Sequence, residues 1–394
     1  MTTTLRRTVL SSDNDGDCGT EDAKGAAITS EEDIFLIFLG CEALPPYGPY
    51  DHTALLFLDL IACAVSDTLK SNHQCVVVLE VYAVSEEPIG EQDCFARFPS
   101  DEDLTNCDGV IVPGSLSSAY DEEKPWILAL KDWIQKNLVA RSIPTLGVCF
   151  GHQMYAHSFA GSSNGSLDQP NNNGSVKIYG GGIAVQCPAG PQAGRKTTEL
   201  TATGQAFLNA AYNPAEIDNY DAQHNVNENS NNNNSVGTNC INTGLDLFYT
   251  HGDMVESLPS QGVSLGGNER VPIQAAIYFS APVVKSDGII RDIIRDNANA
   301  NDCDDKNEKN TRSGPKVIAV TFQAHPEFAS LGKGTKGDET LHDTMKLMKD
   351  KGNLSEQDFV TAEKDAASSV MRVREQSLKA MISAGRLLGW FRKS

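Results

Sequence analysis

The sequence predicts an α/β fold, with a mostly parallel open sheet and helices on both faces. Short continuous apolar runs recur along the chain, and such runs suit strands that are buried on both faces of a parallel sheet. Helical patterns separate several of these runs, and strand–helix–strand alternation produces parallel strands joined by right-handed crossovers. With 394 residues and a hydrophobic fraction of 40%, the chain is long enough for one large or two ordinary domains.

Each element has its own pattern. The run IFLIFL at 34–39, which Gly40 ends, is apolar throughout and predicts the first buried strand. A helix is predicted at 125–138, because Pro125 is suited to the first turn. The other predicted strands are the apolar runs at 76–82, 109–112, 145–148, 245–249, 273–279 and 316–322. The other predicted helices lie at 53–70 and 340–390, the second with a break at 352–353.

Four polar stretches suggest how the chain is organised. Residues 1–31 are small, polar and acidic, which is typical of a disordered N-terminal lead-in. Asn, Ser, Asp and Gly dominate three further stretches, near 162–175, 213–242 and 280–314. We interpret these three as surface insertions, because apolar segments resume after each of them. Residues 32–390 are therefore predicted to form a single domain with three polar insertions.

The charge of the chain excludes some classes of partner. Lys and Arg number 32 against 52 Asp and Glu, so the formal net charge is −20. Phosphate backbones and anionic membrane surfaces repel a chain this acidic, so we expect no nucleic-acid partner and no membrane partner. No apolar run reaches the roughly 18 residues that a membrane span needs.

The ten cysteines include no Cys-x-x-Cys pair. Their spacing therefore favours neither a zinc site nor a disulfide framework. We expect no metal, no cofactor, and reduced thiols in a cytoplasmic protein. The N-terminus has two arginines but lacks the apolar segment of a secretory signal, which leaves a degenerate transit peptide as the open alternative.

The segment Gly147-Val148-Cys149-Phe150-Gly151 follows a predicted strand and opens a predicted helix, which is the setting of a nucleophile elbow. A sharp turn of this kind needs glycines two positions before and after its central residue, because side chains there would collide. Free N–H groups and the dipole at a helix N-terminus favour a thiolate, and the same groups can hold a developing oxyanion. Cys149 is therefore a predicted nucleophile; the alternative is an inert, buried cysteine in a tight turn.

The segment His325-Pro326-Glu327 follows the apolar run at 316–322. A cysteine nucleophile needs a base that takes its proton, and that base needs a third group that orients it. Residues two apart on an extended segment project to the same side, so Glu327 is predicted to orient His325. With Cys149 they form a predicted catalytic triad; the alternative is a surface histidine beside a solvated glutamate.

These two segments together resemble the class I glutamine amidotransferase family. The resemblance covers roughly residues 33–370 and implies the flavodoxin-like fold of that family. It also implies that Cys149 forms a γ-glutamyl thioester and that His325 and Glu327 are its partners. The oxyanion and substrate contacts that the resemblance implies are Gly114, Ser115, Phe150, Gln153, His251 and Asp253.

Residues 108–126 and 359–367 resemble the stand-alone gamma-glutamyl peptidase branch of the family in particular. This resemblance implies an enzyme that cleaves the γ-glutamyl amide of glutamine or of a γ-glutamyl peptide, with a small-molecule substrate. Two alternatives stay open. The chain could be a glutaminase subunit that delivers ammonia to a separate synthetase partner, or a non-catalytic regulatory module on the same fold.

Overall fold

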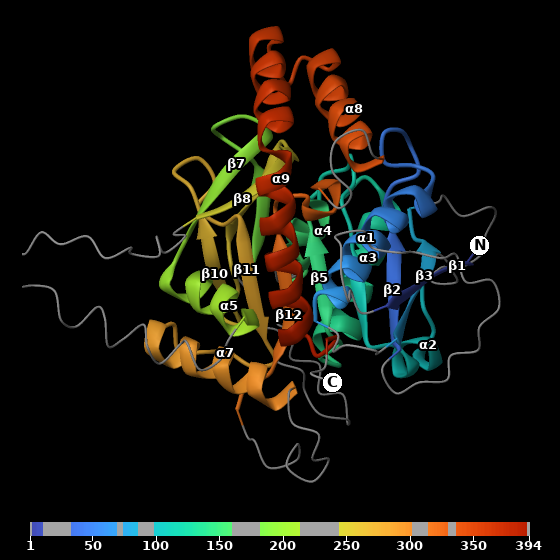
Figure 1. Cartoon of the computed structure of the whole chain (residues 1–394), viewed down its shortest axis with the longest axis vertical. Coiled ribbons are helices and arrows are strands. Elements are labelled where there is room, and N and C mark those ends of the chain that lie inside the picture. Colours follow the sequence, from blue (N-terminus) through green and yellow to red (C-terminus); the bar gives the residue numbers. More distant parts are fainter. Residues whose placement is uncertain are drawn as a thin grey trace, which may run out of the picture.

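A large mixed sheet forms the middle layer of the computed structural model (Figure 1). The residues that the structure describes are 2–10, 33–68, 74–85, 98–159, 182–212, 244–301, 314–329 and 336–391. Within these residues one sheet has ten strands and a second sheet has two.

The strands of the large sheet combine a parallel centre with antiparallel flanks. Their bounds are β1 (Thr2–Leu10), β2 (Ile34–Gly40), β3 (Gln74–Ala83), β4 (Gly109–Val112), β5 (Thr145–Val148), β7 (Gln192–Leu200), β8 (Gly244–His251), β10 (Gly262–Gly267), β11 (Ala275–Phe279) and β12 (Val317–Phe322). They lie in the order β1-β3-β2-β4-β5-β12-β11-β10-β7-β8. The five strands from β3 to β12 are parallel, and the outer pairs are antiparallel. The small sheet pairs β6 (Ile183–Gln186) with β9 (Asp253–Ser257).

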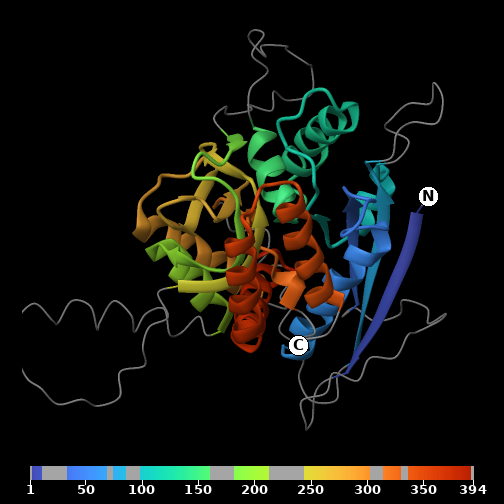
Figure 2. The same cartoon turned by 90° about the horizontal axis from the view of Figure 1, so that it is seen from above.

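Helices cover both faces of the large sheet (Figure 2). Their bounds are α1 (Tyr50–Ser66), α2 (Asp101–Asn106), α3 (Pro125–Trp133), the π-helix η2 (Ile134–Val139), α4 (Phe150–His157), α5 (Ala202–Tyr212), α7 (Asp287–Asn301), the 3₁₀ helix η3 (Pro326–Ala329), α8 (Lys336–Asp350) and α9 (Glu356–Leu387). Helices α1, α5, α7 and the C-terminal part of α9 pack on one face, and α2, α3, η2 and α4 pack on the other. The N-terminal part of α9 leaves the sheet and packs beside α8 (Figure 1).

Strand β2 shows why a continuous apolar run becomes a central strand. Leu36 and Phe38 point into the core on the α1 side, and Ile37 and Leu39 point into the core on the α3 side. All four side chains are at most 1% exposed, because successive residues of a strand face opposite sides of the sheet. The predicted α/β fold, with its parallel strands and its two helical layers, is confirmed.

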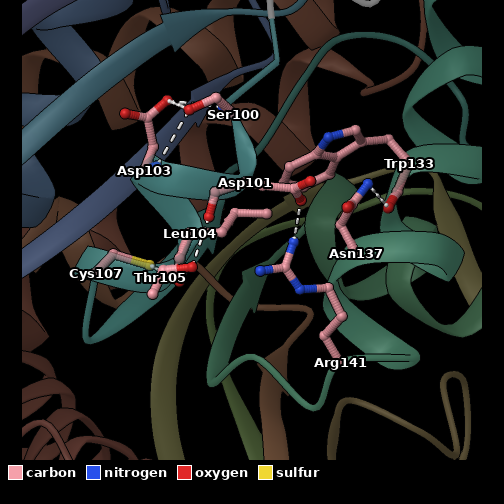
Figure 3. A network of polar contacts seen from close by, with 9 residues as sticks. All are labelled: Ser100, Asp101, Asp103, Leu104, Thr105, Cys107, Trp133, Asn137 and Arg141. Carbon is pink, nitrogen blue, oxygen red and sulfur yellow. Dashed lines mark hydrogen bonds and ion pairs between the residues drawn. The ribbon is translucent and has the colours of Figure 1, made fainter.

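A polar network at the surface joins α2 to the end of η2 (Figure 3). Ser100 and Asp103 form a capping box, in which each side chain accepts a hydrogen bond from the backbone N–H of the other. This box satisfies N–H groups that have no partner inside the helix. Arg141, which follows η2, donates to Asp101 in the first turn of α2. The network therefore holds the amino end of a very short helix.

Part of the predicted N-terminal lead-in is a strand. The prediction that residues 1–31 are disordered is wrong for Thr2–Leu10, which form β1 and pair antiparallel with β3. Arg7 forms an ion pair with Asp59 of α1, and Val9 is buried. Threonine and valine favour strands, but the acidic composition of the longer segment masked that local signal. The remainder of 1–31 lies outside the described residues.

One predicted insertion also contains regular structure. The interpretation of 280–314 as a polar surface insertion is wrong for α7, because Ile290 and Ile294 of this helix are buried in the core. Their spacing of four residues places them on the same helix face, although the segment as a whole is polar. The predicted insertions at 162–175 and 213–242 lie outside the described residues.

Candidate active site

Cys149 occupies a strained turn at the carboxyl end of β5. Its backbone has φ 51° and ψ −104°, and α4 begins at the next residue. A Cβ at Gly151 would lie 1.8 Å from the carbonyl oxygen of Val112, and a Cβ at Gly147 would lie 2.9 Å from the carbonyl oxygen of Gly151. Both positions therefore require glycine. The predicted strand–turn–helix around Cys149 is confirmed.

His325 and Glu327 follow β12, the strand that pairs with β5. Both side chains are 0% exposed, and His325 Nδ1 lies 2.8 Å from Glu327 Oε1. Since the carboxylate only accepts, Nδ1 carries the hydrogen, and Nε2 is the ring nitrogen left for Cys149. The ring also stacks on Phe328, with centroids 4.4 Å apart. Two contacts therefore set the orientation of the imidazole.

The charges around His325 stabilise its protonated form. Burial alone lowers the pKa of His325, but the charges of Cys149 and Glu327 and the hydrogen bond to Glu327 outweigh burial and raise that pKa to about 10. A protonated imidazole beside a cysteine favours the thiolate over the thiol.

The loop after β4 passes over this pair. A Cβ at Gly114 would lie 3.0 Å from His325 Cε1 and 3.7 Å from Cys149 Cβ. Glu42 holds the next part of the loop, where its Oε2 accepts from the Leu116 N–H at 3.2 Å and from Ser115 Oγ at 3.3 Å. The loop therefore brings its backbone close to both Cys149 and His325.

A pocket of about 240 Å³ opens over Cys149. Its lining includes Tyr47, Ser115, Cys149, Gln153, His251 and Asp253. Four of the predicted substrate and oxyanion residues thus lie around one cavity. Gly114 lies beside it against His325, and Phe150 is buried at the first position of α4.

Asp253 connects two sides of the pocket. Its carboxylate accepts from Ser118 Oγ at 2.7 Å and from Tyr120 OH at 2.8 Å, both of which follow β4. Its backbone carbonyl accepts from Gln153 Nε2 at 3.0 Å and from His251 Nδ1 at 2.8 Å. The carboxylate therefore holds the loop after β4, and the carbonyl holds two side chains at the pocket wall.

His251 is neutral and has one free acceptor atom. Burial is the main reason why the pKa of His251 is lowered to about 3. Because Nδ1 donates to the Asp253 carbonyl, Nε2 carries no hydrogen. This nitrogen is buried and has no hydrogen-bond partner within the described part of the chain.

Gln323 was missed by the sequence analysis. It is 0% exposed, and its Nε2 lies 3.7 Å from Cys149 Sγ. A signal was present, since Gln323 stands two residues before His325 and alternate residues of an extended segment share a side. Tyr47 was also missed; its ring centroid lies 6.0 Å from that of His325.

The described residues give no sign of a metal centre. Within them, no group of three or more His, Cys, Asp or Glu side chains is arranged to hold a metal ion. His152, which follows the elbow, donates to or accepts from Thr321 Oγ1 at 2.7 Å and lies 3.3 Å from the Ile273 carbonyl oxygen. It is a packed core histidine. Among the same residues, no helix is both long and apolar enough to cross a membrane.

Comparison with known proteins adds a family match. A family model described as glutamine amidotransferase class-I matches residues 71–269. Gamma-glutamyl peptidase 2 of Arabidopsis thaliana is 44% identical over 58 residues, which are 15% of this chain and 23% of that protein. Gamma-glutamyl peptidase 4 of the same plant is 39% identical over 65 residues, which are 16% of this chain and 25% of that protein. The chain thus matches about a quarter of the length of these curated relatives.

Two solved structures align over most of the chain. A glutamine amidotransferase from Thermotoga maritima is 15% identical, with a TM-score of 0.45, over 90% of this chain and 98% of that one. A glutamine amidotransferase from Methylobacillus flagellatus is 14% identical, with the same TM-score of 0.45, over 93% of this chain and 97% of that one.

Proposed function

Because the chain belongs to the class I glutamine amidotransferase family, we propose that it cleaves a γ-glutamyl amide through a thioester on Cys149. The observation that carries this proposal is that Cys149 lines the pocket and that the buried pair His325 and Glu327 lies beside it. The partial similarity to gamma-glutamyl peptidases supports a γ-glutamyl peptide as substrate.

In the first step, the Cys149 thiolate attacks the γ-carbonyl carbon of the substrate. The carbonyl oxygen becomes an oxyanion, and the N–H of Phe150 is suited to hold it, since the first N–H groups of a helix have no partner inside the helix. The loop at Gly114 and Ser115 would supply the second donor. The C–N bond then breaks, His325 gives its proton to the leaving nitrogen, and the glutamyl group stays on sulfur as a thioester.

In the second step, water replaces the leaving amine. The neutral His325 takes a proton from this water, and the hydroxide attacks the thioester carbon. The C–S bond then breaks, so that glutamate leaves and sulfur keeps the electron pair as the thiolate. His325 then returns to its protonated form beside the Cys149 thiolate. Glu327 keeps the ring in one tautomer and compensates its charge throughout, which is the role of the third member of a triad.

The part of the pocket lining around the Asp253 carbonyl is suited to the α-amino group of the glutamyl part. His251 Nε2 is a bare acceptor in a buried position, and an ammonium group offers three N–H donors. Gln153 lies next to it on the same wall. We therefore propose that His251 and Gln153 bind the glutamyl part of the substrate. Asp253 supports these two side chains through its carbonyl and the loop after β4 through its carboxylate.

The test measures glutamate release by the isolated chain from glutamine and from γ-glutamyl peptides. We expect activity on a γ-glutamyl peptide without any partner. If hydrolysis occurs only after an ATP-using synthetase is added, the chain is a glutaminase subunit. If neither substrate is cleaved under any of these conditions, the chain is a non-catalytic module and the proposal fails.

Replacing the predicted nucleophile tests the proposal directly. Cys149→Ala should lose activity by about 10³-fold or more, because members of a triad act as a unit. Cys63→Ala serves as the control, since Cys63 is a buried cysteine of α1. Hydrolysis that survives Cys149→Ala would end the proposal.

A further inference from the structure

A buried chain of hydrogen bonds joins a backbone carbonyl to the nucleophile. Gln153 Nε2 donates to the Asp253 carbonyl at 3.0 Å and to Gln323 Oε1 at 3.1 Å. Gln323 Nε2 lies 3.7 Å from Cys149 Sγ. The Gln153 and Gln323 side chains are 3% and 0% exposed, so both amides are held by the protein interior.

The direction of each bond follows from the first acceptor. A backbone carbonyl can only accept, so Gln153 must turn its NH₂ group toward Asp253. The same NH₂ group lies against Gln323, which must then present its oxygen, because two donors cannot bond to each other. The other end of the Gln323 amide is its NH₂ group, and this end faces the sulfur.

The Asp253 carbonyl also excludes the reverse orientation of the two amides. Its oxygen has two lone pairs, and it accepts both Gln153 Nε2 and His251 Nδ1. The same carbonyl therefore makes His251 Nε2 an acceptor at one side of the pocket and Gln323 Nε2 a donor at the other.

We propose that Gln323 stabilises the Cys149 thiolate with an N–H group whose direction the Asp253 carbonyl sets through Gln153. An N–H donor to an ionised acceptor makes a stronger bond than one to a neutral acceptor, so the contact favours thiolate over thiol. The proposal rests on the proposed function only in treating Cys149 as the nucleophile. It adds a residue that contacts the reacting atom to the three of the triad.

Gln323 differs from the other groups around the sulfur because it does not titrate. In the part of the chain that the structure describes, His325 and Tyr47 are titratable side chains that interact with Cys149, and Glu327 acts on both of them. The hydrogen bond from Gln323 should therefore stabilise the thiolate equally at every pH. Its removal should shift the whole pH profile of the thiol.

The test is the rate at which iodoacetamide alkylates Cys149 as a function of pH, followed by mass spectrometry of the peptide that contains Cys149. Gln323→Met removes the donor at similar length and should raise the midpoint of this profile by about one pH unit. Gln323→Glu keeps the shape and places a negative charge beside the sulfur, so its midpoint should rise further. An unchanged midpoint in both variants overturns the proposal.

A second variant tests the role of Gln153. Gln153→Met leaves the Gln323 amide free to rotate, so the midpoint should rise, but by less than in Gln323→Met. If only the Gln323 variants move the midpoint, the part of the proposal that assigns direction to Asp253 and Gln153 is overturned. If Gln323→Met does not fold, as judged by circular dichroism, Gln323→Leu carries the test, because it also removes the donor without adding a charge.

The matched control is Gln274→Met. Gln274 is a buried glutamine just before β11, and its amide bonds Gln192 and Thr198 rather than the sulfur. Gln274→Met should leave the midpoint unchanged. An equal rise of the midpoint in Gln274→Met would show that the Gln323 variants act by a general loosening of the core, and this result would overturn the proposal. Alkylation uses no γ-glutamyl substrate, so this test is independent of hydrolysis. If the protein hydrolyses no substrate but the variants show the expected midpoints, the proposed function fails and the role of Gln323 stands.

Discussion

The network around Cys149 and the network at α2 (Figure 3) use the same kinds of contact in different surroundings. Each contains an acidic residue paired with a basic one and polar side chains that bond to backbone groups. His325 and Glu327 are both fully buried, whereas in the α2 network the Asp101 side chain is 89% exposed and that of Arg141 is 31% exposed.

Burial, rather than the type of bond, therefore decides how much a polar contact in this protein contributes. In the interior each donor needs a partner, and the bonds constrain one another, so directions are fixed and charges are strongly coupled. At the surface water can replace either partner, and an ion pair contributes little. The buried network should therefore be sensitive to single substitutions that keep shape, and the surface network should tolerate them.

The largest effect is expected for Glu327→Gln. The variant keeps the shape of the side chain but removes the charge that holds His325 in one tautomer, so kcat for γ-glutamyl hydrolysis should fall about 10³- to 10⁴-fold. Asp101→Asn makes the same chemical change in the surface network and should leave kcat unchanged. A loss below about tenfold in Glu327→Gln would contradict the role of that carboxylate.

The next effect concerns acid stability. Burial lowers the pKa of His152 to about 4, from an ordinary value of 6.5. The unfolded chain therefore takes up this proton first, and the free energy of unfolding should fall as the pH falls from about 6.5 to about 4. His152→Gln removes the group, so the slope of stability against pH should decrease by up to about 1.4 kcal/mol per pH unit. Urea denaturation at several pH values measures it; equal slopes in both proteins would show that His152 already titrates normally.

A smaller effect is expected at the amino end of α2. Ser100→Ala removes the side chain that accepts from the Asp103 N–H and should lower the free energy of unfolding by about 1 kcal/mol. Ser100→Gly is the matched control, because glycine at this position costs only a few tenths of a kcal/mol. Hydrolysis rates of both variants should equal the wild-type rate, and a fall in kcat would mean that this network is coupled to the pocket.

The smallest effect is expected for Arg141→Met. The ion pair with Asp101 is largely exposed, so its loss should change the free energy of unfolding by less than about 1 kcal/mol. The difference should shrink further in high salt, because salt screens exposed charges. A salt-independent cost of several kcal/mol would remove the contrast between the two networks.

The elements that the sequence predicted well have a signal inside a few residues. The run at 34–39 alternates between two cores, and the segment around Cys149 combines a strand, two required glycines and a helix. β1 and α7 were missed because composition was averaged over a longer polar segment, which concealed a nine-residue strand and two isoleucines four positions apart. Predictions for 162–175 and 213–242 remain predictions, as does the catalytic role of each pocket residue.

Local sequence was enough to predict the turn at Cys149 and the contact between His325 and Glu327. Both depend on steric contacts and side-chain lengths within two to five neighbouring positions. Only the tertiary structure decided that Gln323, 174 positions from Cys149, touches its sulfur, since that contact depends on β12 lying next to β5. It also decided which way the buried amides point. A hydrogen-bond direction is set by the neighbouring acceptor, and the neighbour of Gln153 is a backbone carbonyl 100 positions away that no local pattern identifies.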